Sequence, residues 1–481
     1  MSNIKWSVDL DNVIGEVKGE LYGGFVEHLG RNVYGGIYDP GSPVADEDGF
    51  RKDVIELVRE LNMPVTRYPG GCYVDLERWE DSVGKERRSR IDPAWHQIEP
   101  NTFGLDEFMK WAKKADTTPL ITINTGNRSL LDTLSLYEYC NIPGGTYWSE
   151  QRRANGVEKP YNIKNWCIGN ELYGNWEIGQ MSVEEYARNA REHGKLLKKV
   201  DPDCRLIASG SPYDMAWNRK LLELAGKYID VISLHDAFYM LGDTTEFQYL
   251  KSIERFEKYL TDTIKECKAY EALNGKRIAV SVDEWIIWDF ERRMRPEEEW
   301  TTGMHLLEQD YTILEALIAG SFFSCLHRHA ADVDIACIAQ SVNVIAPIRT
   351  EPDGTCWKQS IYYPFELTSR YGRGISLKVN DENNDKGYIY GSAVWNKEHN
   401  EITLFVTNRA EEACEFSCAL PANTENLNQC ITMFCNDHKA VNGPGNSKNI
   451  APKELQGNLN NSTFSSTLPP VSWSMIRIQL R

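Results

Sequence analysis

Short apolar runs alternate with longer amphipathic stretches between about residue 20 and residue 370 of this chain. Each run has the length and composition of a buried strand, and the stretch after it has apolar residues at helical spacing. Eight strands that alternate with helices over this length favour a (β/α)8 barrel over an open doubly wound sheet. The strand candidates are Tyr22–Val26, Val65–Tyr68, Leu120–Asn124, Asn165–Gly169, Arg205–Ser209, Val231–Leu234, Ile278–Val282 and Ile335–Ala339.

The segment after the fourth strand candidate shows the helical part of this pattern. Ser182 and Glu185 form a capping box, and apolar residues then recur on one face as far as Val200. The same spacing predicts further helices over Arg51–Leu61, Leu105–Ala115, Phe247–Leu273 and Leu306–Leu326. No Gly-x-Gly-x-x-Gly turn follows a strand candidate, which argues against a dinucleotide-binding fold.

The pattern of the sequence changes after about residue 374. Short strand-like segments are separated there by Asn, Gly, Pro and Lys turns, a pattern typical of a β-sandwich. They are Tyr388–Trp395, Glu401–Asn408, Cys414–Leu420 and Ser474–Leu480. We therefore predict three segments: residues 1–18 pair as strand into the β-sandwich, residues 19–374 form the catalytic (β/α)8 barrel, and residues 375–481 form a jelly-roll-like β-sandwich domain.

Charge and composition narrow the class of protein. A formal net charge of −17 argues against nucleic acid or anionic membrane as a partner, because a polyanion would be repelled. The chain starts without a basic segment followed by an apolar one, and no apolar stretch is long enough to span a bilayer. The 12 cysteines are scattered and form no Cys-x-x-Cys pair, which is typical of reduced, buried thiols. We expect a cytoplasmic enzyme.

Polar residues close most of the strand candidates, and a barrel carries its active site at that end of its strands. Among them, Glu171 and Glu284 form a pair, and two carboxylates at one rim are the minimum that is needed to split a glycosidic bond. One must hold a proton near neutral pH while the other stays ionised. Any single one of these residues is explained by a polar strand end that is exposed to solvent. Several such residues in register at the strand ends are less readily explained in this way. The others are Glu27, His28, Arg67, Asn124, Asn170, His235 and Gln340.

Several segments resemble the α-L-arabinofuranosidases of glycoside hydrolase family 51. The pair Asn170-Glu171 is shared by a whole clan of barrel glycosidases, whereas Glu27–Arg31 and Ala339–Pro347 are far more diagnostic. The resemblance runs almost from end to end of the chain. It is carried by Gly24–Tyr38, Arg67–Cys72, Trp166–Glu171, Asp283–Trp285, Leu326–Asp332, Ala339–Pro347 and Pro469–Arg477.

The resemblance implies a retaining exo-glycosidase that releases terminal non-reducing α-L-arabinofuranosyl residues from arabino-oligosaccharides. Glu284 would attack the anomeric carbon, and Glu171 would protonate the leaving oxygen and then activate water. This double displacement needs the two carboxyl groups about 5–5.5 Å apart.

The resemblance also implies the residues that bind the sugar. Arg67 would keep Glu284 ionised, and Asn170 would contact the 2-hydroxyl of the sugar. Glu27 would accept from hydroxyls on the far side of the ring, and Gln340 would close the pocket. Cys72, His235 and Tyr239 complete the expected set.

Two positions depart from the family pattern. Many members have Asn where this chain has Cys72, and they often have His-Gln-Tyr-Tyr where this chain has His235-Asp-Ala-Phe-Tyr239. A tyrosine of that loop commonly touches the nucleophile, and Phe238 and Tyr239 both remain candidates for its place. The altered loop leaves open the same mechanism on a β-D-galactofuranoside, a β-xyloside or a β-glucan. The presence of both carboxylates argues against a non-catalytic carbohydrate-binding protein.

No cofactor is expected from the sequence. It contains no His-Glu-x-x-His motif and no clustered Cys/His spacing, so we expect no catalytic metal. The resemblance implies a homo-oligomer, commonly a hexamer, that acts on arabinofuranose-containing oligosaccharides.

Overall fold

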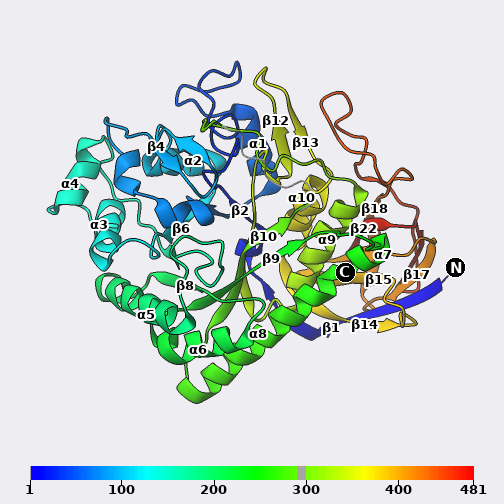
Figure 1. Ribbon diagram of the computed structural model, residues 1–481. Helices are drawn as coiled ribbons and strands as arrows, with labels where there is room; N and C mark the ends of the chain where they lie inside the picture. Colours follow the sequence, from blue (N-terminus) through cyan, green and yellow to red (C-terminus); the bar gives the residue numbers. More distant parts are fainter. Residues whose placement is uncertain (1, 290–298) are drawn as a thin grey trace.

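The computed structural model describes residues 2–289 and 299–481. Eight parallel strands close into a barrel in the order β10-β11-β2-β3-β6-β7-β8-β9 (Figure 1), so the predicted barrel is confirmed. Their bounds are β2 Gly23–Phe25, β3 Val65–Tyr68, β6 Thr118–Ile123, β7 Asn165–Ile168, β8 Arg205–Ser209, β9 Val231–Phe238, β10 Ala279–Ile287 and β11 Val333–Ile338.

Helices follow the strands on the outside of the barrel (Figure 1). The Ser182 side chain accepts from the Glu185 backbone and the Glu185 carboxylate accepts from Ser182 N, which confirms the capping box. The bounds are α1 Lys52–Leu61, α2 Leu105–Ala115, α3 Leu130–Asn141, α4 Tyr147–Ala154, α5 Val183–Val200, α6 Met215–Ala225, α7 Glu246–Leu250, α8 Ser252–Asn274, α9 Ile313–Arg328 and α10 Tyr362–Tyr371.

Two predicted helices have different limits in the structure. The stretch predicted as one helix over Phe247–Leu273 is divided into α7 and α8 at Lys251. The last predicted helix begins at Ile313 rather than Leu306, because Thr312 caps its first turn and Glu315 closes the capping box. Capping by Thr312 thus decides where α9 begins, whereas Lys251 forms no side-chain cap at the start of α8.

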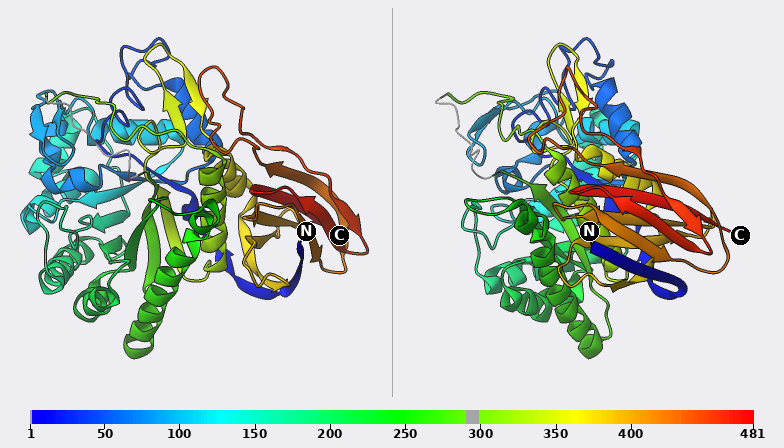
Figure 2. Two further views of the ribbon diagram at one scale, coloured as in Figure 1. Left: turned by 45° about the vertical axis from the view of Figure 1, so that its right-hand side comes forward. Right: turned by 90° about the vertical axis from the view of Figure 1, so that its right-hand side faces the viewer.

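The carboxy-terminal part is a ten-stranded sheet in the order β19-β18-β22-β16-β15-β14-β1-β17-β21-β20. Side chains from strands far apart in this order, such as Phe416, Phe464, Leu404 and Ile476, share one buried cluster. The sheet therefore folds over itself as a sandwich (Figure 2). The bounds are β1 Ser2–Val17, β14 Gly374–Glu382, β15 Ile389–Asn396, β16 Glu401–Asn408, β17 Cys414–Ala419, β18 Thr424–Met433, β19 Lys453–Glu454, β20 Asn458–Asn460, β21 Thr463–Leu468 and β22 Ser472–Leu480.

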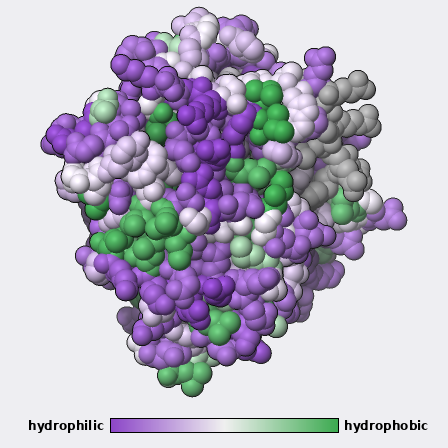
Figure 3. Space-filling view, turned by 60° about the vertical axis from the view of Figure 1, so that its left-hand side comes forward, coloured by the Kyte–Doolittle hydropathy of each residue, from purple (hydrophilic) through white to green (hydrophobic). Residues whose placement is uncertain are grey.

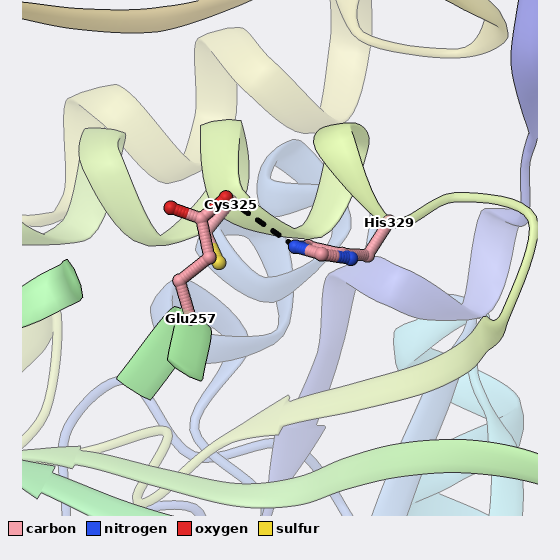
Figure 4. Close-up of side chains that lie close together, drawn as sticks. All are labelled: Glu257, Cys325 and His329. Carbon is pink, nitrogen blue, oxygen red and sulfur yellow. Dashed lines mark hydrogen bonds and ion pairs between the residues drawn. The ribbon is translucent and has the colours of Figure 1, made fainter. Parts of the chain in front are cut away.

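A polar cluster joins the barrel to this sheet. Glu257 of α8 lies beside Cys325 and His329 at the end of α9 (Figure 4). Glu257 Oε1 accepts from Arg328 Nε at 2.9 Å and lies 3.3 Å from His329 Nε2, while Oε2 accepts from Tyr390 OH of β15 at 2.9 Å. Both oxygens of this carboxylate thus have partners, and the three elements are held together.

Helix α9 is apolar on all sides because it lies between the barrel and the sheet. Gly320, near its middle, allows the closest approach: a Cβ at this position would lie 2.2 Å from Cδ1 and Nε1 of Trp473 on β22. We expect Gly320→Ala to lower the free energy of unfolding by about 1–3 kcal/mol, as overpacking does. Alanine would favour the helix by about 1 kcal/mol, but the rigid indole cannot move aside.

The measurement for Gly320→Ala is the midpoint of thermal unfolding. Gly443→Ala is the matched control, since no heavy atom lies within 4 Å of a Cβ there. Equal midpoints for the two variants would show that α9 and β22 are not packed this closely.

One face, shown in Figure 3, is mostly hydrophilic and carries separate hydrophobic patches. Among the described residues, no helix combines the length and the apolar character that crossing a membrane requires.

Candidate active site

The rim at the carboxyl ends of the barrel strands brings most of the predicted residues together. The register of β9 and β10 places His235 opposite Glu284. The side chains of Glu171 and Glu284 are 16% and 11% exposed, so both can be reached from solvent. The remaining residues lie as follows: Glu27 after β2, Arg67 in β3, Asn170 and Glu171 after β7, and Gln340 after β11.

An irregularity in β10 shapes the part of the site that holds Glu284. Consecutive side chains of a regular strand point to opposite faces. The register of β10 with β9 shifts between Ser281 and Glu284, and such irregularities redirect side chains. As a result, Asp283 and Glu284 both face Arg67, with Oδ2 of Asp283 3.4 Å from Nε and Oε2 of Glu284 2.7 Å from Nη1.

His235 connects the two candidate catalytic carboxylates. Its Nδ1 lies 2.9 Å from Glu171 Oε1 and 3.6 Å from Glu284 Oε2, and its Nε2 lies 3.9 Å from Asp283 Oδ1. Burial alone would lower the pKa of His235, but Glu284, Asp283 and Glu171 raise it to about 10. The imidazole is therefore protonated near neutral pH, and its Nδ1–H donates to Glu171 Oε1.

Glu171 accepts from three donors. Besides His235, they are Trp176 Nε1 at 2.7 Å from Oε2 and Tyr173 OH at 3.2 Å from Oε1. Burial acts to raise the pKa of Glu171, but these hydrogen bonds bring it below its ordinary value. The proton of this cluster thus lies on His235, directly beside the Glu171 carboxylate.

Arg67 holds Glu284 from the other side. Its Nη1 donates to Glu284 Oε2 and its Nη2 donates to Asn170 Oδ1, each at 2.7 Å. Burial and the charge of Glu171 raise the pKa of Glu284 above its ordinary value, although the two cations, His235 and Arg67, act to lower it. The geometry leaves Glu284 oriented between two positive charges, as a nucleophilic carboxylate requires.

Glu27 and Gln340 form a hydrogen-bonded pair at the rim. Gln340 Nε2 donates to Glu27 Oε2 at 2.8 Å, and Glu27 Oε1 accepts from Trp95 Nε1 at 2.9 Å and from Tyr73 N at 3.2 Å. Burial and the charge of Glu284 raise the pKa of Glu27 to about 8. At neutral pH this side chain is therefore largely a neutral acid, which can donate a hydrogen bond as well as accept one.

Asn170 and Cys72 share a partner that sequence reasoning missed. Glu177 Oε1 accepts from Asn170 Nδ2 at 2.7 Å and from the Cys72 thiol at 3.1 Å. Burial and the negative charge of Glu177 raise the pKa of Cys72 well above its ordinary value, so the thiol stays neutral. No motif marks Glu177: Asn170 is seven residues away in the chain, whereas the contact with Cys72 joins side chains 105 residues apart.

Two other candidates, Phe238 and Asn124, lie outside this cluster. Phe238 is buried among Phe256 and Phe322, and the Tyr239 ring lies 5.6 Å from the Arg255 guanidinium carbon. The role predicted for Tyr239 stays a prediction. Asn124 Nδ2 donates to the carbonyl oxygens of Asp75 and Glu77 and so holds the loop after β3.

His28 also has a supporting place rather than one among the reacting groups. It is buried, with Nδ1 2.7 Å from Glu99 Oε2 and Nε2 2.9 Å from Tyr68 OH, and it stacks on Tyr73. It thus packs beneath the segment that carries Glu27.

Comparisons with known proteins cover the whole chain. The family described as α-L-arabinofuranosidase 1 domain matches residues 57–259, and the family described as α-L-arabinofuranosidase C-terminal domain matches residues 283–472. The intracellular exo-α-(1→5)-L-arabinofuranosidase 1 of Bacillus subtilis is 39% identical, over 100% of this chain and 99% of that protein. The exo-α-(1→6)-L-arabinofuranosidase of Bifidobacterium longum is 38% identical, over 98% of this chain and 96% of that protein.

The fold also matches a solved structure along its full length. It is that of a family 51 α-L-arabinofuranosidase from Bifidobacterium longum, with a TM-score of 0.94 and 33% sequence identity, and the match covers 100% of both chains.

Proposed function

This chain belongs to the α-L-arabinofuranosidases of glycoside hydrolase family 51, and from that premise we propose that Glu171 and Glu284 are its acid/base and its nucleophile. The chain is a glycoside hydrolase that releases terminal α-L-arabinofuranosyl residues with retention of configuration. The observation that carries the two roles is the arrangement around His235, whose Nδ1 faces both carboxylates while Arg67 holds only Glu284.

In the first step Glu284 attacks the anomeric carbon as the bond to the leaving oxygen breaks. Arg67 keeps the attacking carboxylate ionised and aimed. Glu171 supplies the proton that the leaving oxygen takes up. The neighbouring Nδ1–H of His235, 2.9 Å from Glu171 Oε1, is the source from which Glu171 can receive that proton.

In the second step Glu171, now ionised, removes a proton from water, which attacks the glycosyl-enzyme and frees Glu284. The contacts of His235 support a short separation of the two carboxyl groups. Both carboxylate oxygens lie next to one nitrogen, at 2.9 and 3.6 Å. This favours the spacing of about 5–5.5 Å of retaining enzymes over the wider spacing of inverting ones, which must admit a water.

The other pocket residues recognise the sugar. Asn170 contacts the 2-hydroxyl, Glu27 and Gln340 contact hydroxyls of the opposite side, and Cys72 lies against the ring. His235 and Tyr239 complete the set. The relatives named above act on arabinofuranosides, which supports arabinofuranose as the sugar in this pocket rather than a xyloside or a glucan.

We expect the transfer product to reveal retention. Hydrolysis of 4-nitrophenyl α-L-arabinofuranoside in dilute methanol should yield methyl α-L-arabinofuranoside, because two successive inversions restore the starting configuration. Proton NMR identifies the anomer, and formation of the β-glycoside would contradict the double displacement.

The sugar specificity is tested with other aryl glycosides. For the 4-nitrophenyl β-D-xyloside and β-D-galactofuranoside, kcat/KM should be lower than for the α-L-arabinofuranoside by on the order of 10²-fold or more.

Two further properties belong to the proposal. The intracellular naming of the Bacillus subtilis relative supports a cytoplasmic location. Association into a homo-oligomer, with a hexamer as the expected state, is to be measured as the mass in solution by light scattering.

A further inference from the structure

Glu177 is a buried carboxylate that the proposed reaction leaves without a role. It lies in the loop after β7, six residues beyond Glu171, and is only 5% exposed. Its Oε1 accepts from Asn170 Nδ2 and from the Cys72 thiol. Both neighbours belong to the wall of the sugar pocket, so Glu177 lies directly behind that wall.

The Asn170 amide is held at both ends by this arrangement. Its Oδ1 accepts from Arg67 and its Nδ2 donates to Glu177, each at 2.7 Å. An amide nitrogen has two donors, so one N–H of Asn170 remains for the sugar. The hydrogen bond from Arg67 fixes the position of the amide oxygen of Asn170. The hydrogen bond to Glu177 then fixes the direction of the second N–H.

Glu177 is in turn held by Asp75. Both carboxyl oxygens of Asp75 and Oε2 of Glu177 are buried and find no donor among the described side chains and backbone. Two adjacent buried carboxyl groups cannot both be ionised. Burial, together with the hydrogen bond to Glu177 and its charge, raises the pKa of Asp75 to about 10. Asp75 thus carries the proton of its hydrogen bond with Glu177.

We propose that Glu177, held by Asp75, is a positioning residue that aims the Asn170 amide at the 2-hydroxyl of the substrate. The inference rests on the proposed contact between Asn170 and that hydroxyl. This hydrogen bond strengthens as the oxocarbenium-like transition state forms. Misdirection of the amide therefore lowers kcat more than it raises KM, and only for substrates that have a 2-hydroxyl.

The test compares two substrates, 4-nitrophenyl α-L-arabinofuranoside and its 2-deoxy analogue. We expect Glu177→Ala to lower kcat/KM about 10- to 100-fold on the arabinofuranoside, mainly in kcat, and less than about 3-fold on the 2-deoxy analogue. Glu177→Gln should recover most of this loss, because its carbonyl accepts from Asn170 and Cys72 and its amide donates to Asp75. Thermal midpoints of both variants identify any loss of fold.

Asn170→Ala separates this inference from the function on which it rests. If Asn170→Ala discriminates between the two substrates and Glu177→Ala slows both equally, Glu177 is only structural and the inference is wrong. If Asn170→Ala itself slows both equally, the 2-hydroxyl contact is wrong, and the inference falls with it. The double variant should lose no more than Asn170→Ala alone, since both changes remove one interaction.

Discussion

Replacing the Glu284 carboxylate should remove turnover almost completely. We expect Glu284→Gln to lower kcat on 4-nitrophenyl α-L-arabinofuranoside on the order of 10⁵-fold, because the glycosyl-enzyme can no longer form. Glutamine keeps the shape of glutamate and can still accept from Arg67 Nη1, so the thermal midpoint should change little. Retention of more than about 1% of the activity would contradict the nucleophile assignment.

A control and a rescue make this result specific. Glu223→Gln on α6 is the matched control, because that carboxylate is 62% exposed and pairs only with Lys220 among the described residues. In Glu284→Ala, azide can enter the space of the lost carboxylate and attack the sugar from the same face. The expected product is the β-L-arabinofuranosyl azide, which NMR distinguishes from the α-anomer.

The second large effect is expected at Glu171, and its size should depend on the leaving group. Glu171→Ala removes the proton donor, so hydrolysis of an arabino-oligosaccharide, whose sugar leaves poorly, should slow about 10³- to 10⁴-fold. A 4-nitrophenolate leaves without protonation. With 4-nitrophenyl α-L-arabinofuranoside, the variant should therefore show a burst of nitrophenol. Slow release of the sugar should follow, because Glu171 no longer activates the water of the second step.

Azide should restore the second step in Glu171→Ala, because it is a nucleophile that needs no general base. Since it attacks the glycosyl-enzyme opposite Glu284, the product is the α-L-arabinofuranosyl azide, the opposite anomer to that of Glu284→Ala. The wild-type enzyme should not be accelerated. Equal slowing of both substrates, or no response to azide, would contradict the acid/base assignment.

Much of the fold could be predicted from local pattern. The limits of β3, β8 and α2 agree with the predicted ranges Val65–Tyr68, Arg205–Ser209 and Leu105–Ala115. Each short segment buries its apolar residues at the period of its own secondary structure, so the pattern can be recognised in the sequence. The break at Lys251 between α7 and α8 could not be predicted this way, because the amphipathic spacing continues through it.

The residues of the candidate site that lie at strand ends could be predicted, because the strand ends themselves could be predicted. A parallel barrel brings the carboxyl ends of its strands to one rim, so topology brings Glu27, Arg67, Asn170, Glu284 and Gln340 to that rim. The direction of the Glu284 side chain depends on the shift in β10. Groups such as Trp95 and Trp176 come from loops. Their hydrogen bonds to Glu27 and Glu171 depend on how each loop folds back over the rim.

The sequence by itself determined the barrel, the rim that carries chemistry, and the two carboxylates that suit glycoside cleavage, because each follows from periodicity and strand order. Only the tertiary structure decided what surrounds each group. The shift in β10 turns Asp283 and Glu284 toward one arginine, His235 places a proton beside Glu171, and Asp75 faces Glu177 from another loop. These relations join side chains far apart in the chain, and the electrostatics of a buried group depend on its neighbours in space rather than in sequence.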